Sequence, residues 1–205
     1  MEKLSNTIKQ NIENAISKVE KKSSCELVAV IAKKSGNYRY FAMLGASLIS
    51  LVVPFFLIMA QPFIDALFVY QIQAVVFVIL FLLLNIDNIL IMLLPKNILH
   101  KQAKLKAYET FIILGLQKTT NHQAVMIYVS AYEKYVQILT DGAISSKIDN
   151  SIWQNTIDKF TAKVKNKEFD NGFSEAIEEI GEILVEKFPI QENDKNELPN
   201  HLIEI

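Results

Sequence analysis

Residues 41–60 read FAMLGASLISLVVPFFLIMA, twenty consecutive positions without a charged side chain. As an α-helix this segment would extend about 30 Å, which matches the hydrocarbon core of a bilayer. Helices buried inside soluble proteins are seldom apolar on every face over such a length. The segment therefore predicts a transmembrane helix. Pro54 is tolerable there because neighbouring groups can satisfy the freed carbonyl.

A second apolar stretch follows at residues 66–84, ALFVYQIQAVVFVILFLLL, with two glutamines and no charge. The connection at 61–65 is so short that it predicts a hairpin turn. Asp87 then interrupts the apolar sequence before residues 89–94. A charge at the bilayer centre costs at least ~2.5 kcal/mol, so we expect the span to end near Leu84 and Asp87 to lie among the headgroups. Residues 89–94 would begin an interfacial helix, and an intramembrane, functional Asp87 is the alternative.

Composition excludes several classes of function. The chain has 205 residues, and its 21 basic and 22 acidic residues leave a net charge of −1, so nucleic acid is not an expected partner. The single cysteine, Cys25, permits neither an internal disulfide nor a cysteine-based zinc site. The sequence contains no phosphate-binding loop, no dinucleotide-binding glycine motif and no Gly-X-Ser-X-Gly, so no organic cofactor is expected.

Basic residues flank the two apolar stretches, and the turn between them has none. They are Lys33, Lys34 and Arg39 before the first stretch, and Lys96, Lys101, Lys104 and Lys106 after the second. The positive-inside rule therefore predicts a multi-pass protein with both termini in the cytoplasm, and Cys25 in a reducing compartment. Residues 1–40 hold eight basic and four acidic residues, whereas residues 167–205 hold three and eleven. The basic part would face anionic lipid and the acidic part water, or the acidic part would bind cations or a basic partner.

The flanking regions carry the elements of an α/β domain. Apolar residues from Leu4 to Val19 recur at helical spacing, and ELVAVIA at 26–32 predicts a strand covered on both faces. After the membrane, residues 95–117 predict a helix. AVMIYVS at 124–130 predicts a second buried strand, and KYVQILT at 134–140 a strand with one wet face.

Two further helices complete the predicted domain. Asp149 or Ser151 could cap a helix that runs to Val164, and Asn171-Gly172 would separate it from a last helix that Pro189 stops. We therefore expect a small mixed sheet with helices on both faces, split by an inserted two-helix transmembrane hairpin. The predicted parts are 1–39 (helix and first strand), 40–94 (hairpin with interfacial extension), 95–189 (remainder of the domain) and 190–205 (polar tail).

The order of these segments resembles a known family. ELVAVIA, a membrane hairpin, GLQKTTNHQAVMIYVSAYEKYVQILTDGAISSKID, FDNGFSEAIEEIGEILVEKFP and a NELP tail resemble the TPM domain family, in particular its bacterial inner-membrane branch. The resemblance implies an α/β/α sandwich and a location in the bacterial inner (plasma) membrane. For some members it also implies acid phosphatase activity and divalent cations bound by acidic residues in loops at one end of the sheet.

The match to that acidic site is partial. The family has a glycine-rich turn after its last strand and an Asp seven residues later, and Gly142 and Asp149 keep this spacing. Asp141 adds a second carboxylate, so Asp141 and Asp149 are the candidate metal ligands, for weak calcium or magnesium binding. The family's other acidic position precedes the middle strand, where this chain has His122-Gln123-Ala124. The Asp-containing segment that opens many TPM domains is also absent.

Two functions of different class follow. In the first, a TPM-like domain is anchored at the cytoplasmic face of the membrane and acts as a binding or scaffold module for another membrane protein. In the second, the chain is a weak phosphatase that depends on divalent cations and acts at the end of the sheet. The incomplete acidic cluster favours the first, and no catalytic residue can be assigned. The oligomeric state does not follow from the sequence.

Overall fold

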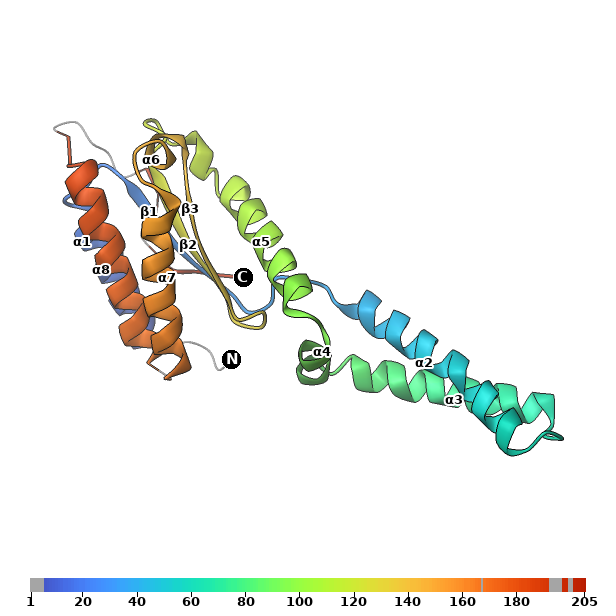
Figure 1. Cartoon of the computed structure of the whole chain (residues 1–205). Coiled ribbons are helices and arrows are strands. Elements are labelled where there is room, and N and C mark those ends of the chain that lie inside the picture. The colour runs from blue at the N-terminus through green and yellow to red at the C-terminus, as the bar shows by residue number, and fades with distance from the viewer. Residues whose placement is uncertain (1–5, 167, 192–196, 199–200) are drawn as a thin grey trace. The chain divides into compact units, whose positions relative to one another are not determined.

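A computed structural model of the chain (Figure 1) describes residues 6–166, 168–191, 197–198 and 201–205, and at residues 87 and 88 it describes the backbone only. The chain forms two compact units, one made of Met1–Ser35 with His100–Ile205 and the other of Gly36–Leu99. Leu4, residues 192–196 and 199–200 of the predicted polar tail, and the side chain of Asp87 lie outside the described residues.

The first unit is built on a mixed sheet of four strands in the order β3-β2-β1-β4. Strand β1 pairs in parallel with β2, from Glu26 opposite Ala124 to Ala32 opposite Ser130. Strand β2 pairs antiparallel with β3, and β4 lies parallel to β1 on its other side. The strands are β1 (Glu26–Ala32), β2 (Ala124–Ser130), β3 (Tyr135–Thr140) and β4 (Ile203–Glu204).

Both faces of β1 are buried, as its apolar sequence predicts. Leu27, Ala29 and Ile31 pack in one core with residues of α1 (Asn6–Glu20), α7 (Asn150–Lys165) and α8 (Phe169–Lys187). The alternate residues of β1 pack in a second core against α5 (Lys96–Ile113). Figure 1 shows α1, α7 and α8 on one side of the sheet and α5 on the other. The predicted α/β fold with helices on both faces of a mixed sheet is therefore confirmed.

The predicted break between α7 and α8 is misplaced. Asn171-Gly172 lies inside α8, which begins at Phe169. A Cβ on Gly172 would lie 3.0 Å from the Cβ of Lys163 on α7, so glycine is needed there for close helix packing and not for a turn. In a sequence, Asn-Gly can indicate either a turn or a close contact between helices. Here tertiary packing requires the close contact.

The end of α5 and the C-terminal tail also differ from the predictions. The helix expected over 95–117 ends at Ile113, because Gly115 adopts a left-handed conformation (φ 72°) that leads into the short 3-10 helix η1 (Leu116–Lys118). The tail contributes β4, which was not predicted. A strand of two residues shows no alternation that could be recognised, although Leu202 beside it is buried in the core.

The second unit contains the helical hairpin and a short helix. Helices α2 (Arg39–Ala60) and α3 (Ala66–Leu84) pack along each other and are followed by α4 (Asp87–Leu93). Ala42, Ala46 and Ser50 are the buried residues of α2, and a Cβ on the neighbouring Gly45 would lie 3.3 Å from Cδ1 of Leu84. Small residues at four-residue spacing allow such close packing of two apolar helices. Asp65 is the N-cap of α3, and its carboxylate accepts the Phe68 N–H at 3.1 Å.

Candidate functional site

The first predicted metal ligand lies at the end of the sheet where β1 and β2 begin and β3 ends. Glu26 is in register with Ala124, and Val125 is opposite Thr140, the last residue of β3. Asp141 directly follows β3, and its N–H donates to the Ala124 carbonyl at 2.9 Å. The starts of β1 and β2 therefore lie beside the end of β3, because β3 runs antiparallel to β2.

His122 and Asp141 form a pair at this end of the sheet. Nδ1 of His122 lies 3.0 Å from Oδ2 of Asp141, whose Oδ1 accepts the Gly142 N–H at 2.7 Å. A hydrogen on Nδ1 of His122 would be donated to Oδ2 of Asp141, because an ionised carboxylate only accepts hydrogen bonds. The His122 backbone has a φ of 53°, and its carbonyl accepts the Ala143 N–H. Both oxygens of Asp141 thus have partners within the chain, the imidazole of His122 and the Gly142 N–H.

Asp149 lies immediately before α7 and caps it; of the two predicted candidates, Asp149 and Ser151, it is Asp149 that forms the cap. Its Oδ1 accepts the Ser151 N–H at 2.8 Å. Hydrogen bonds from the Ser151 side chain and main chain hold the pKa of the fully exposed Asp149 carboxyl below its usual value. Asp141 is likewise the N-cap of the short helix α6 (Gly142–Ser145), which was not predicted. The two candidate ligands therefore begin successive helices, where a carboxylate stabilises the free N–H groups.

No third ligand joins them in the described part of the chain. Among those residues, no group of three or more His, Cys, Asp or Glu side chains is arranged to hold a metal ion. Calcium takes six to eight oxygen ligands, and magnesium an octahedron completed partly by water. Asp141 and Asp149 each cap a helix at this end of the sheet.

The sequence did not reveal a buried glutamate at the same end of the sheet. Glu26 is only 9% exposed, and its carboxylate accepts the N–H groups of Glu197 at 2.8 Å and Leu198 at 3.3 Å. The Glu197 carboxylate in turn accepts the Thr120 N–H. The C-terminal segment is therefore attached to the sheet by two acidic residues. The only signal in the sequence is a charged residue at the start of an otherwise apolar strand.

A second buried glutamate lies at the opposite end of the sheet, where β1 and β2 end. Glu133, in the turn between β2 and β3, is 2% exposed, and its two oxygens accept the Ser35 N–H at 3.0 and 3.1 Å. The Ser130 hydroxyl also donates to it, and Ser35 Oγ lies 2.8 Å from the Tyr128 hydroxyl. Burial, together with the nearby charge of Glu133, raises the pKa of Tyr128. This cluster secures the point at which the chain leaves the sheet for residues 36–99.

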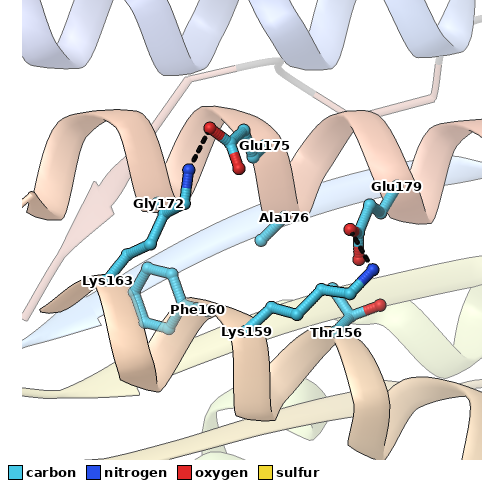
Figure 2. A pocket seen from close by; sticks show the side chains of 8 residues that line it. All are labelled: Thr156, Lys159, Phe160, Lys163, Gly172, Glu175, Ala176 and Glu179. Atoms are coloured by element: carbon cyan, nitrogen blue, oxygen red, sulfur yellow. Dashed lines mark hydrogen bonds and ion pairs between the residues drawn. The ribbon is translucent and has the colours of Figure 1, made fainter.

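A shallow depression lies between α7 and α8 (Figure 2). Two ion pairs cross it, Lys163 with Glu175 and Lys159 with Glu179, the latter with 2.6 Å between Nζ and Oε1. Its cavity volume is about 10 Å³, far below the 300–1,000 Å³ typical of ligand pockets. It is lined by Thr156, Lys159, Phe160, Lys163, Gly172, Glu175, Ala176 and Glu179. The depression therefore belongs to the packing of two helices.

Comparison with known proteins supports the family resemblance. A family model described as TPM domain matches residues 88–183. The fold is similar to the NMR structure of the BA42 protein from the psychrophilic bacterium Bizionia argentinensis, with a TM-score of 0.63 and 19% identity over 100% of this chain and 98% of that chain. At that identity the likeness shows the fold alone. No curated protein matches the chain significantly.

Proposed function

The chain contains a TPM domain, and we propose that it is a membrane-anchored binding module. In this proposal, α2 and α3 cross the bacterial inner membrane as a hairpin, and residues 89–94 lie at the membrane interface. The α/β unit, with both termini of the chain, lies in the cytoplasm and presents its surface to another membrane protein.

The observation that carries the proposal is the exposed apolar surface of α2 and α3. Only 17% of the most apolar 18-residue stretch of α2 and 11% of that of α3 is buried, whereas a core helix of a soluble domain would be mostly buried. Both helices are long and apolar enough to cross a bilayer. Water is a poor solvent for such a surface, and lipid satisfies it. The lysines and Arg39 that flank the hairpin support the cytoplasmic orientation.

The acidic residues at the two ends of the sheet support a binding function over a catalytic one. Asp141 and Asp149 cap helices, and Asp141 is paired with His122. The buried acids Glu26 and Glu133 accept main-chain N–H groups that hold the fold together. A phosphatase needs positioned positive charge or a metal beside a nucleophile or an activated water. These carboxylates already have structural partners, and that favours a surface that recognises another protein.

Membrane insertion and orientation are tested together in bacterial cells. The full chain should stay in the membrane pellet after alkaline carbonate extraction. Cys25 is a poor reporter because it is 2% exposed, so single cysteines are placed by Phe63→Cys and Ile152→Cys in a Cys25→Ala background. Phe63 lies in the turn between α2 and α3, and Ile152 on α7. An impermeant maleimide should label position 63 in intact spheroplasts and position 152 only after the membrane is opened.

Two results would contradict this proposal. Release of the chain by carbonate would show that the hairpin is not inserted. Labelling of position 152 but not position 63 in intact spheroplasts would reverse the orientation. Both positions are exposed, so their labelling after solubilisation controls for the reactivity of the thiols.

The resemblance also implies an alternative function, weak phosphatase activity with divalent cations bound at Asp141 and Asp149. This alternative is tested separately. We expect millimolar calcium or magnesium to change the melting temperature little, and the purified chain to hydrolyse generic phosphate esters no faster than background. Asp149→Ala should lower the melting temperature slightly, through the lost helix cap. Metal-dependent hydrolysis that Asp149→Asn abolishes while the fold stays intact would establish the enzyme instead.

A further inference from the structure

Helix α5 has an outward face made of Lys101, Lys104, Leu105, Tyr108 and Ile112. These residues recur every three or four positions and are exposed: Leu105 to 55%, Tyr108 to 46% and Ile112 to 61%. The spacing places them on one side of the helix. Three large apolar side chains in a row on the surface of a single helix are more than the scattered exposed residues of an ordinary soluble domain.

The other side of α5 already has its partner. Ala103 and Thr110 are buried, and Ala107 and Phe111 pack in the core with Met126 of β2. The two sides are about half a turn apart on a helical wheel. The outward face therefore adds nothing to the core of the α/β unit, and a different partner must account for its apolar character.

The charge of α5 indicates the chemistry of that partner. The helix carries four lysines and one glutamate, Glu109, whose Oε2 lies 3.0 Å from Nζ of Lys106. Lys101 and Lys104 remain on the outward face, and Nζ of Lys104 lies 6.0 Å from the centre of the Tyr108 ring. Lysine ammonium groups beside apolar and tyrosine side chains suit the boundary between acyl chains and anionic headgroups.

Continuity with the hairpin favours lipid as the occupant. Eleven residues separate the end of α3 at Leu84 from the start of α5 at Lys96. Even fully extended, that segment spans at most about 40 Å. If α3 crosses a bilayer, α5 begins close to the bilayer surface, where the local concentration of lipid headgroups is high.

We propose that the outward face of α5 binds in the plane of the same bilayer, with Leu105, Tyr108 and Ile112 in the acyl boundary and Lys101 and Lys104 on anionic phospholipid headgroups. This rests on the proposed membrane anchoring. Docking by this face leaves the α7 and α8 side of the sheet directed away from the lipid, which is the side available to a protein partner.

The test uses the full chain in lipid nanodiscs, with an environment-sensitive fluorophore on a single cysteine in the Cys25→Ala background. One variant carries Ile112→Cys on the outward face. The matched control carries Ile152→Cys, an exposed isoleucine on α7 at the other face of the sheet. Nanodiscs contain phosphatidylcholine alone or mixed with phosphatidylglycerol, and a lipid-borne quencher reports on contact with acyl chains.

With phosphatidylglycerol we expect strong quenching at position 112 and little at position 152. Each lysine near an anionic surface changes binding by about fivefold, so Lys101→Glu with Lys104→Glu should shift the docking equilibrium more than tenfold and abolish the quenching. Circular dichroism checks that these two exposed substitutions leave the fold intact. Neutral lipid should give weaker quenching at position 112 than the anionic mixture.

Two results would overturn the proposal. Equal, low quenching at positions 112 and 152 in anionic nanodiscs would show that α5 does not contact lipid. A label at position 112 that is shielded from an aqueous quencher but not quenched from the lipid would identify a protein on this face, such as a second copy of the chain. Failure of the anchoring itself is distinguishable, because the chain would then be released by alkaline carbonate before any docking is measured.

Discussion

Residues 95–205 produced alone are expected to form no stable domain. They lack β1, which lies between β2 and β4 in the sheet, and α1, which packs on the same core. Full burial of one large aliphatic side chain contributes about 1.5–3 kcal/mol, and the whole stability of a domain is about 5–15 kcal/mol. Loss of the following buried side chains removes more than the domain can spare: Ile12, Ile16, Val19, Leu27, Val28, Val30 and Ile31.

The control is the same domain with its first part restored. A chain in which a flexible glycine-serine linker replaces residues 40–94 keeps β1 and α1, and we expect it to be soluble, monomeric and cooperatively melting. The fragment 95–205 should instead aggregate or show no thermal transition by circular dichroism. A cooperative transition in the fragment would mean that the sheet can close without its central strand.

Strands β1 and β2 could be predicted to the residue because each is a run of apolar side chains between polar ones. Such a run reports burial on both faces, and all seven residues of each strand are buried. Strand β4 could not be predicted, because only Val30 and Ile31 of β1 pair with it. A pairing so short is decided by the partner strand and leaves no pattern of its own.

The site was predictable in part for a related reason. Asp149 precedes an amphipathic segment, and that local pattern predicts a helix cap. The roles of Glu26 and Glu133 depend on N–H groups at Glu197 and Ser35, 171 and 98 positions away. Such long-range partners are invisible in a single sequence. The pairing of His122 with Asp141 likewise follows from the meeting of a loop and a strand end.

Gly181→Ala is expected to destabilise the α/β unit by about 1–3 kcal/mol, the usual cost of overpacking a core. Gly181 lies on α8 against Val19 of α1, and a Cβ there would approach Cγ2 of Val19 to 2.3 Å and Cγ1 to 3.3 Å. A valine in a helix has one strongly preferred rotamer, so the clash cannot be relieved by a simple rotation. Alanine would raise the helix propensity of α8 by about 1 kcal/mol, so any net loss of stability reports the contact.

Val19→Ala supplies the matched rescue. Alone it should destabilise the unit, because it removes two buried methyl groups and leaves a cavity. Combined with Gly181→Ala, the new methyl group enters the vacated space, so the double variant should be more stable than the sum of the two single effects by about 1 kcal/mol or more. Gly142→Ala is the control, because a Cβ at Gly142 meets nothing within 4 Å, and its effect should stay within about 0.5 kcal/mol.

The three variants and the double variant are compared by urea denaturation of the linker-closed domain, or by thermal denaturation of the full chain in detergent. A Gly181→Ala domain as stable as the parent would show that α1 can move away from α8 without loss. Additive effects in the double variant would place the origin of any destabilisation outside the contact between Gly181 and Val19. In either case the contact between α1 and α8 would not be what determines how the N-terminal helix is held on the second half of the split domain.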